Sequence, residues 1–240
     1  MSENTPVALV AGVGPGTGAA ISRRFSLGGY RVAMLARTRE RLDALQREIP
    51  NARGYRCDVT EETQLDSVID SVIEAVRRDL GPPKVFIHNA VGGAFGNFLE
   101  IDPKALALNF QVNTMALLYL ARRLAPAMVE AGEGAIVVTG NTSALRGKPR
   151  FAGFAPTKAA QRILAESIAR ELGPKGVHVA YVVIDAVIDL EWTRAMASKP
   201  AGDPFFIQPS AIADEIWHVV HQDRSAWSFN VEVRPFRETW

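Results

Sequence analysis

Four glycines near the start of the chain alternate with other residues in a pattern suited to binding phosphate. They follow an apolar run, Val7–Ala11, that predicts a buried strand, and helical spacing resumes over Ala19–Leu27. Glycine lets a backbone approach an anion closely, and the first turn of a helix presents unpaired N–H groups to it. A glycine-rich loop alone is often only a tight turn, but a strand before it and a helix after it favour nucleotide binding. The predicted loop residues are Gly12, Gly14, Gly16, Thr17 and Gly18.

A cation stands where a second strand, Arg31–Ala36, is expected to end. In dinucleotide-binding folds this position faces the adenosine ribose, where a carboxylate suits NAD and an arginine suits the 2′-phosphate of NADP. The chain has Arg37 there, and its next acid is Glu40. The alternative is that Arg37 only begins a solvated basic helix. The charge favours NADP(H) over NAD(H).

The spacing of the glycines resembles that of the short-chain dehydrogenase/reductase family. Gly12 and Gly16 are separated by three residues and Gly16 and Gly18 by one, whereas the common dinucleotide fingerprint has gaps of one and two. The resemblance extends over essentially the whole chain. It implies an α/β fold: a single-domain Rossmann-type, doubly wound parallel sheet of about seven strands with helices on both faces.

The resemblance also assigns residues to the adenosine half of the site. The pair Asp58-Val59 would lie against the adenine, although Asp58 or Thr60 could instead cap a helix starting near Glu61. Asn89-Ala90 would lie near the cofactor ribose. His88 precedes this pair where the family has another asparagine, and we expect it to satisfy hydrogen bonds at the strand end rather than to do chemistry.

The chemical half of the site departs from the family pattern. The family has a serine after the fifth strand and, thirteen residues further on, a Tyr-x-x-x-Lys motif. The matching residues here are Asn141, Phe154 and Lys158, with Ser143 close to the serine position. Phe154 cannot exchange a proton, and loss of a positioned acid or base costs about 10²–10⁴ in rate. We expect Phe154 to pack in a pocket or in the core.

Two further residues are implied for catalysis. Lys158 would hold the nicotinamide ribose, the alternative being an ordinary exposed helix lysine. Asn113 would break its helix to hold a water that connects the lysine with solvent, although a tolerated surface asparagine reads the same from sequence. Asn141 with Ser143 would polarise the substrate oxygen.

The nicotinamide end of the predicted site is rebuilt relative to the family. Asp185-Ala186 replace the usual Pro-Gly, while Ile188 could offer its backbone to the cofactor amide. An aromatic, proline-broken segment follows, and residues 189–208 are predicted to form a lid over an apolar substrate. The alternative is a plain surface helix.

Periodicity places the remaining elements. Further strands are expected at Ala52–Cys57, Lys84–His88, Ala135–Thr139, Val177–Ile184 and Ser228–Val233. Helices are expected from the region of Arg39 to Glu48, at Glu61–Asp79 and Pro103–Glu130, from Phe154 to about Leu172, and at Ala211–His221. The long apolar stretch Pro103–Glu130 has its counterpart at a subunit interface in the family, so a homodimer or homotetramer is expected.

Composition bounds the class of protein. The 240 residues suit one domain, 48% are hydrophobic, and the net charge of +1 gives no reason to expect nucleic acid or a membrane surface as partner. The single cysteine, Cys57, and a short polar start without an apolar signal segment favour the cytoplasm. His218 and His221 have no third ligand nearby, so no metal site is expected.

Two hypotheses of function follow. The first is an NADP(H)-dependent oxidoreductase that acts on an apolar carbonyl or alcohol by an atypical proton path. The second is a catalytically silent NADP(H)-binding sensor or partner subunit, which the missing tyrosine, the missing serine and the altered Pro-Gly favour. If the pocket is otherwise competent, Phe154→Tyr should raise carbonyl reduction.

Overall fold

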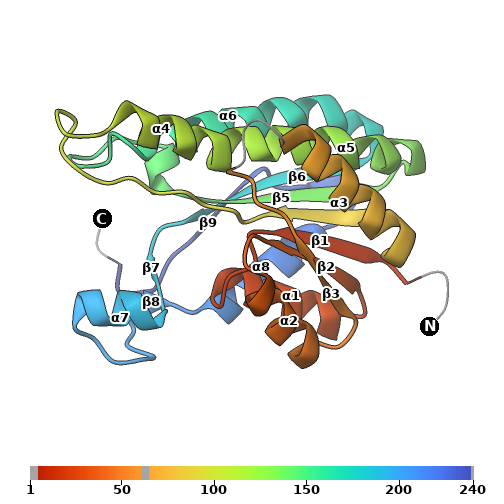
Figure 1. Cartoon of the computed structure of the whole chain (residues 1–240), viewed down its shortest axis with the longest axis horizontal. Helices are drawn as coiled ribbons and strands as arrows, with labels where there is room; N and C mark the ends of the chain where they lie inside the picture. Colours follow the sequence, from red (N-terminus) through yellow and green to blue (C-terminus); the bar gives the residue numbers. More distant parts are fainter. Residues whose placement is uncertain (1–4, 61–64, 239–240) are drawn as a thin grey trace.

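A parallel sheet forms the centre of the computed structural model, which describes residues 5–60 and 65–238. Within these residues seven strands pair in the order β3-β2-β1-β4-β5-β6-β9, all parallel (Figure 1). This arrangement confirms the predicted fold class. The strands are β1 (Val7–Ala11), β2 (Arg31–Ala36), β3 (Ala52–Arg56), β4 (Pro83–His88), β5 (Gly134–Asn141), β6 (Val177–Ile184) and β9 (Asn230–Val233).

Helices cover both faces of the sheet. Figure 1 shows α1, α2 and α8 on one side and α3, α4, α5 and α6 on the other. Their bounds are α1 (Thr17–Leu27), α2 (Arg39–Glu48), α3 (Leu65–Leu80), α4 (Pro103–Phe110), α5 (Ala116–Ala131), α6 (Ala155–Leu172) and α8 (Pro209–Val220).

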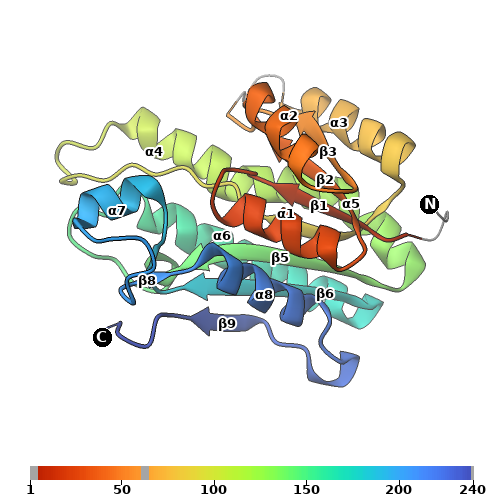
Figure 2. The ribbon, with the colours of Figure 1, turned by 90° about the horizontal axis from the view of Figure 1, so that it is seen from below.

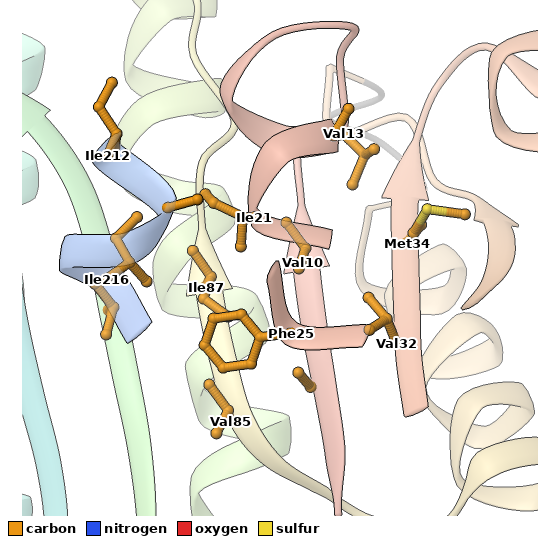
Figure 3. Close-up of a cluster of buried hydrophobic side chains, with 14 of the residues drawn as sticks. Val10, Val13, Ile21, Phe25, Val32, Met34, Val85, Ile87, Ile212 and Ile216 are labelled. Atoms are coloured by element: carbon orange, nitrogen blue, oxygen red, sulfur yellow. The ribbon is translucent and has the colours of Figure 1, made fainter. Parts of the chain in front are cut away.

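The buried run of β1 explains why both faces need a cover. Ala8 and Val10 belong to the core beneath α1 and α8, whereas Leu9 and Ala11 belong to the core beneath α3, α5 and α6. Figure 3 shows the first core, in which Phe25 of α1 lies over the central strands. A central parallel strand is buried on both sides, so it is apolar throughout rather than alternating.

A separate two-stranded sheet lies between β6 and β9 in the chain and was not predicted. β7 (Val187–Ile188) pairs with β8 (Phe206–Ile207), and α7 (Glu191–Ala197) lies between them in the chain. Figures 1 and 2 place α7 at the same end of the molecule as the loop before α4. The predicted lid segment is therefore held by a short strand pair at its two ends.

Several predicted boundaries differ from the structure. The long helix expected at Pro103–Glu130 is interrupted by a π-helical turn at Gln111–Met115. Phe154 caps α6 rather than lying within it. The expected helix start at residues 61–64 lies outside the described residues. Among the described helices, none is long and apolar enough to cross a bilayer.

Candidate active site

A cleft of about 1360 Å³ opens at the carboxyl ends of the strands. Its walls come from the loops after β1 to β6 and from α7. Small-molecule pockets commonly measure about 300–1000 Å³, so this cleft has room for an extended ligand together with a second small molecule. Ligands of open parallel sheets bind at the carboxyl ends of the strands, which is where this cleft lies. The predicted loop residues Gly12, Gly14, Gly16, Thr17 and Gly18 all line it.

The glycine loop is packed so closely that two of its members have no room for a side chain. A Cβ on Gly12 would lie 2.4 Å from the Ala90 nitrogen, and the φ of Gly12 is +87°. A Cβ on Gly18 would lie 2.6 Å from the Gly12 oxygen. Gly14 differs, because a Cβ there would meet nothing within 4 Å. The loop is therefore packed against the protein at Gly12 and Gly18 and is open at Gly14.

The first turn of α1 supplies donors to this open side. The helix starts at Thr17 with Gly16 as its N-cap, and no side chain of the described residues caps it. The first N–H groups of a helix lack intrahelical partners, and their dipoles favour an anion. Backbone, space and charge thus fit a diphosphate.

The end of the cleft predicted to take the adenosine carries two exposed cations. Arg37 lines the cleft, and Arg41, in the first turn of α2, lines it as well. Arg41 was not among the residues predicted from the sequence, although it is a second cation in the first turn of the helix expected there. Arg39 between them is turned to an ion pair with Asp43 at 3.0 Å. The two lining guanidiniums suit a phosphate on the ribose.

The acidic residue predicted to meet the adenine is partly used by the protein itself. Asp58 Oδ1 accepts hydrogen bonds from the Thr60 nitrogen at 3.1 Å and from its hydroxyl at 2.7 Å. Val59 and Asp58 both line the cleft. The Val59 carbonyl accepts from Gln111 Nε2 at 3.4 Å, which ties this loop to the π-helical turn. The second oxygen of Asp58 has no hydrogen-bond partner among residues 5–60 and 65–238.

Asn89 links the carboxyl ends of three neighbouring strands, β1, β4 and β5. Its Nδ2 donates to the Gly12 oxygen at 2.8 Å, and its Oδ1 accepts from the Thr139 hydroxyl at 3.1 Å. The side chain therefore positions the glycine loop. Ala90 packs directly behind Gly12, and both Asn89 and Ala90 line the cleft.

Asn113 lies in the π-helical turn and is fully buried. Its Oδ1 accepts from the Gly92 nitrogen at 2.9 Å, and its Nδ2 donates to the Gly92 oxygen and, at 2.8 Å, to the Thr157 hydroxyl. The helical ladder breaks here, as the sequence implied. The freed Asn113 carbonyl accepts from Gln161 Nε2 at 2.6 Å, a protein partner that the predicted relay did not include.

Lys158 lines the cleft while only 2% of it is exposed. Its Nζ donates to the Thr139 carbonyl at 3.0 Å and to Gln161 Oε1 in a very short bond. Burial lowers the pKa of this amine to about 7, because the low-dielectric interior disfavours the ammonium form. Lys158 is thus not an ordinary surface lysine.

Gln161 is a second functional candidate that was not predicted from the sequence. It is fully buried, it bridges Lys158 to the Asn113 carbonyl, and its Oε1 also accepts from the Tyr181 hydroxyl at 3.3 Å. A readable signal was present, because an amide three residues after Lys158 shares its face of α6.

His88 corrects one prediction. The ring is fully buried, and neither of its nitrogens has a hydrogen-bond partner among the described residues. The expectation that it satisfies bonds at the strand end was therefore wrong. Burial, and secondarily the charge of Lys158, lowers the pKa of His88 to about 3. The imidazole is neutral at physiological pH.

The residues at the predicted serine and tyrosine positions differ in whether they line the cleft. Asn141 lines the cleft, and its Oδ1 accepts from the Ser143 nitrogen at 3.1 Å. Ser143 itself lines a second pocket of about 720 Å³. Phe154 is 5% exposed, and its ring centroid lies 5.0 Å from that of Phe95. The described lining of the cleft includes neither Ser143 nor Phe154.

The end of the cleft predicted to take the nicotinamide is bordered by the segment after β6. The Ile188 carbonyl accepts from the Thr193 hydroxyl at 2.6 Å, and its residue lines the cleft. Buried Asp189 joins distant parts of the segment 189–208, accepting from Arg194, Gln208 and the Gly202 nitrogen at 2.8 Å each. A Cβ on Gly16 would meet a Leu190 methyl at 2.4 Å, so this segment packs directly on the glycine loop.

Fold and cleft together define a Rossmann-type dinucleotide-binding protein. The profile of the short chain dehydrogenase family matches residues 6–196. L-xylulose reductase of Cavia porcellus is 30% identical over 173 residues, which cover 72% of this chain and 68% of that protein. The chain belongs to the short-chain dehydrogenase/reductase family of NAD(P)-dependent oxidoreductases.

Solved structures agree with this assignment. A short-chain dehydrogenase from Rhodopseudomonas palustris has 29% identity and a TM-score of 0.82, and the match covers 97% of this chain and 100% of that one. A metagenomic short-chain oxidoreductase in complex with NADP has 28% identity and a TM-score of 0.83, with 98% of each chain covered.

Proposed function

We propose that this chain transfers hydride between NADP(H) and the carbonyl or hydroxyl carbon of a small, largely apolar substrate. The observation that carries the proposal is one continuous cleft whose lining joins the glycine loop to Lys158 and Asn141. The first feature suits a diphosphate, and the other two can orient a reacting oxygen. When bound, the reduced nicotinamide supplies the hydride.

The residues proposed to hold the cofactor follow the length of the cleft. The backbone of the glycine loop and the start of α1 bind the diphosphate. Asp58, Val59, Asn89 and Ala90 line the adenosine half, and Ile188 lines the nicotinamide half. We assign the preference for NADP(H) over NAD(H) to Arg37 and Arg41, since a charge-assisted bond is worth about 1.5–3 kcal/mol.

The proposed catalytic group is small. Asn141 can donate its amide hydrogens to the substrate oxygen, because only its Oδ1 is used within the described residues. Asn113 acts from behind by fixing Gly92 and Thr157. Ser143 would reach the substrate only if part of it extends into the second pocket. Phe154 offers no proton, so the proton path is atypical.

The substrate is proposed to lie under residues 189–208. Trp192 of α7 lines the cleft and is 62% exposed, and Ile184 and Ala186 add apolar wall on the other side. A homodimer or homotetramer in the cytoplasm is part of the same proposal. It rests on the resemblance in the sequence and on exposed apolar side chains such as Leu108 and Ile163.

A second candidate function is a silent NADP(H)-binding module. The packing of Phe154 against Phe95 favours it, because no phenol is presented where the family motif would have one. Such a protein would bind the cofactor with the same loop and arginines but would reduce nothing.

One experiment separates the two candidates. NADPH is titrated by its fluorescence, and its oxidation is then followed with a panel of aldehydes, ketones and quinones. Turnover of any carbonyl supports the oxidoreductase. Tight binding without turnover across the panel supports the silent module, and absence of binding refutes both.

A further inference from the structure

The proton of the proposed reaction needs a source, and the hydrogen bonds around Lys158 suggest one. An ammonium group carries three hydrogens. Two of those on Nζ are used within the protein, by the Thr139 carbonyl and by Gln161 Oε1. Lys158 nevertheless lines the cleft. The one position on Nζ without a partner among the described residues is therefore the one available to a ligand.

Gln161 holds the Lys158 amine in place and occupies one of its hydrogen-bonding positions. Its two amide atoms are both engaged, Oε1 with Lys158 and Tyr181 and Nε2 with the Asn113 carbonyl at 2.6 Å. A carboxamide does not release a proton near neutral pH. The inner face of Nζ is thus held by groups that accept a hydrogen bond without exchanging its proton.

The other titratable groups that face Lys158 are unsuited to the task. His88 approaches from β4, but it is fully buried, and its pKa of about 3 leaves it without a proton to give. Tyr181 approaches from β6, but it is fully buried, its pKa is raised by burial, and its hydroxyl donates to Gln161. Neither residue is among those that line the cleft.

We infer that Lys158, held by Thr139 and Gln161, delivers the proton to the substrate oxygen in place of the phenol that Phe154 lacks. This inference rests on the proposed function. In the step, the carbonyl carbon accepts a hydride from the reduced nicotinamide and the π pair of the C=O bond moves to oxygen. That oxygen takes the third proton of Nζ, which leaves an alcohol, the oxidised cofactor and a neutral lysine. Solvent restores the proton through the cleft.

Gln161 is accordingly a positioning residue. Its contact keeps the amine at the wall of the cleft, and its neutrality lets burial lower the pKa of Lys158 to about 7. An acid with a pKa near the working pH is the most effective proton donor. Because reduction requires the ammonium form, kcat should be constant at low pH and fall above about pH 7.

The test separates proton delivery from cofactor binding. Lys158→Met should lower kcat for carbonyl reduction at least 100-fold, and saturating NADPH should not restore it. Lys175→Met, at an exposed lysine beside Glu171, is the matched control and should change nothing. If Lys158 only holds the ribose, the variant will instead raise the KM for NADPH and recover kcat at saturation, which would overturn the inference.

Gln161 variants supply the second measurement. Gln161→Glu places a carboxylate beside Nζ, and its negative charge favours the ammonium form. The pH at which kcat falls should therefore rise by at least one unit. Gln161→Leu frees Nζ and should lower kcat at least tenfold, with the Kd for NADPH changed less than threefold. A pH midpoint that stays in place in Gln161→Glu contradicts the role given to Lys158.

A readout without turnover completes the design. In ¹⁵N-lysine-labelled protein, the Nζ signal that is missing in Lys158→Met should titrate near pH 7, and higher in Gln161→Glu. A midpoint above pH 9 in the wild type would overturn the inference. Wild-type protein that binds NADPH but reduces no carbonyl would overturn the proposed function as well, whereas turnover with an unmoved pH profile would overturn only the role of Lys158.

Discussion

The two ends of the cleft are built in different ways. At the proposed diphosphate end the backbone forms the site. A Cβ on Gly12 or Gly18 would lie 2.6 Å or less from a neighbouring backbone atom, and no side chain of the described residues caps the start of α1. At the proposed reacting end side chains form the site, and Gln161 links Lys158 to the Asn113 carbonyl. A site formed by backbone groups keeps its function when neighbouring side chains change. A site formed by side chains changes its chemistry whenever one of them is substituted.

This difference explains why the family pattern survives unequally along the chain. Binding a diphosphate needs only close approach and N–H donors, so the glycines are sufficient. Proton transfer needs a group of suitable pKa at a fixed point. Under the proposed function, a phenylalanine at position 154 would change the path of the proton and leave the diphosphate-binding loop unchanged. Predictions that act on one end and spare the other test this separation.

Gly14→Ala should have the largest effect on binding. The new methyl group enters the open side of the loop, where the Cβ meets no protein atom within 4 Å, so stability should stay unchanged. A diphosphate there loses two charge-assisted bonds of about 1.5 kcal/mol each, and the Kd for NADPH should rise about 100-fold. Fluorescence titration and thermal unfolding measure the two quantities.

Two further glycine variants frame that result. Gly173→Ala also meets open space, far from the loop in sequence, and should change neither quantity. Gly18→Ala presses on the Gly12 oxygen and should cost about 1–3 kcal/mol of stability in addition to affinity. Unchanged NADPH affinity in Gly14→Ala would mean that the loop does not face the cofactor.

Removal of the two arginines should have the next largest effect. Arg37→Ala and Arg41→Ala should each weaken NADPH binding about tenfold and leave NADH binding nearly unchanged, because only NADP(H) carries the 2′-phosphate. Arg39→Ala is the control, since that side chain pairs with Asp43. Tighter binding of NADH than of NADPH by the wild type would refute the assignment.

The sequence predicted the fold because its signals are local. A run such as Val7–Ala11 can only be a central parallel strand once glycines and a helix follow it, and the structure has β1 at those residues. The β7–β8 pair was missed because two-residue strands have no periodicity to detect. The π-helical turn at Gln111–Met115 was missed in detail because it is set by contacts with α6, which is distant in sequence.

The lining of the cleft was predictable in part. Residues whose role depends on position along a strand or loop, such as Arg37 and Asn141, line the cleft as expected. Gln161 and His88 acquire their importance from burial beside Lys158, which is a tertiary property. Sequence spacing could suggest that Gln161 faces Lys158, but it could not show that the amide reaches the Asn113 carbonyl.

His88→Leu tests the reacting end through stability. The folded ring takes a proton only near pH 3, whereas an unfolded histidine does so near pH 6.5, so the unfolded state binds more protons between these values. The free energy of unfolding is therefore unaffected by this ring above pH 6.5 and decreases as the pH falls toward 3, by up to about 1.4 kcal/mol per pH unit. The variant should flatten this slope in urea unfolding between pH 4.5 and 7.5.

A matched histidine makes the slope interpretable. His218 is exposed on α8, and His218→Leu should keep the acid sensitivity of the wild type. At neutral pH, His88→Leu should be close to neutral in stability, because it removes two unpartnered buried nitrogens at the cost of some packing. An unchanged slope in this variant would show that the ring is protonated or hydrated in the folded protein.

Phe154→Tyr should have the smallest effect, although the sequence alone suggested a gain. The ring of Phe154 is directed to Phe95, and the residue is 5% exposed and outside the described lining of the cleft. A hydroxyl added there meets an aromatic ring rather than a substrate, so kcat for carbonyl reduction should change less than about threefold. A general acid in place normally contributes about 10²–10⁴. A rise of that size would therefore show that residue 154 turns into the cleft during reaction, and that the two ends of the site differ by a single missing oxygen rather than by their construction.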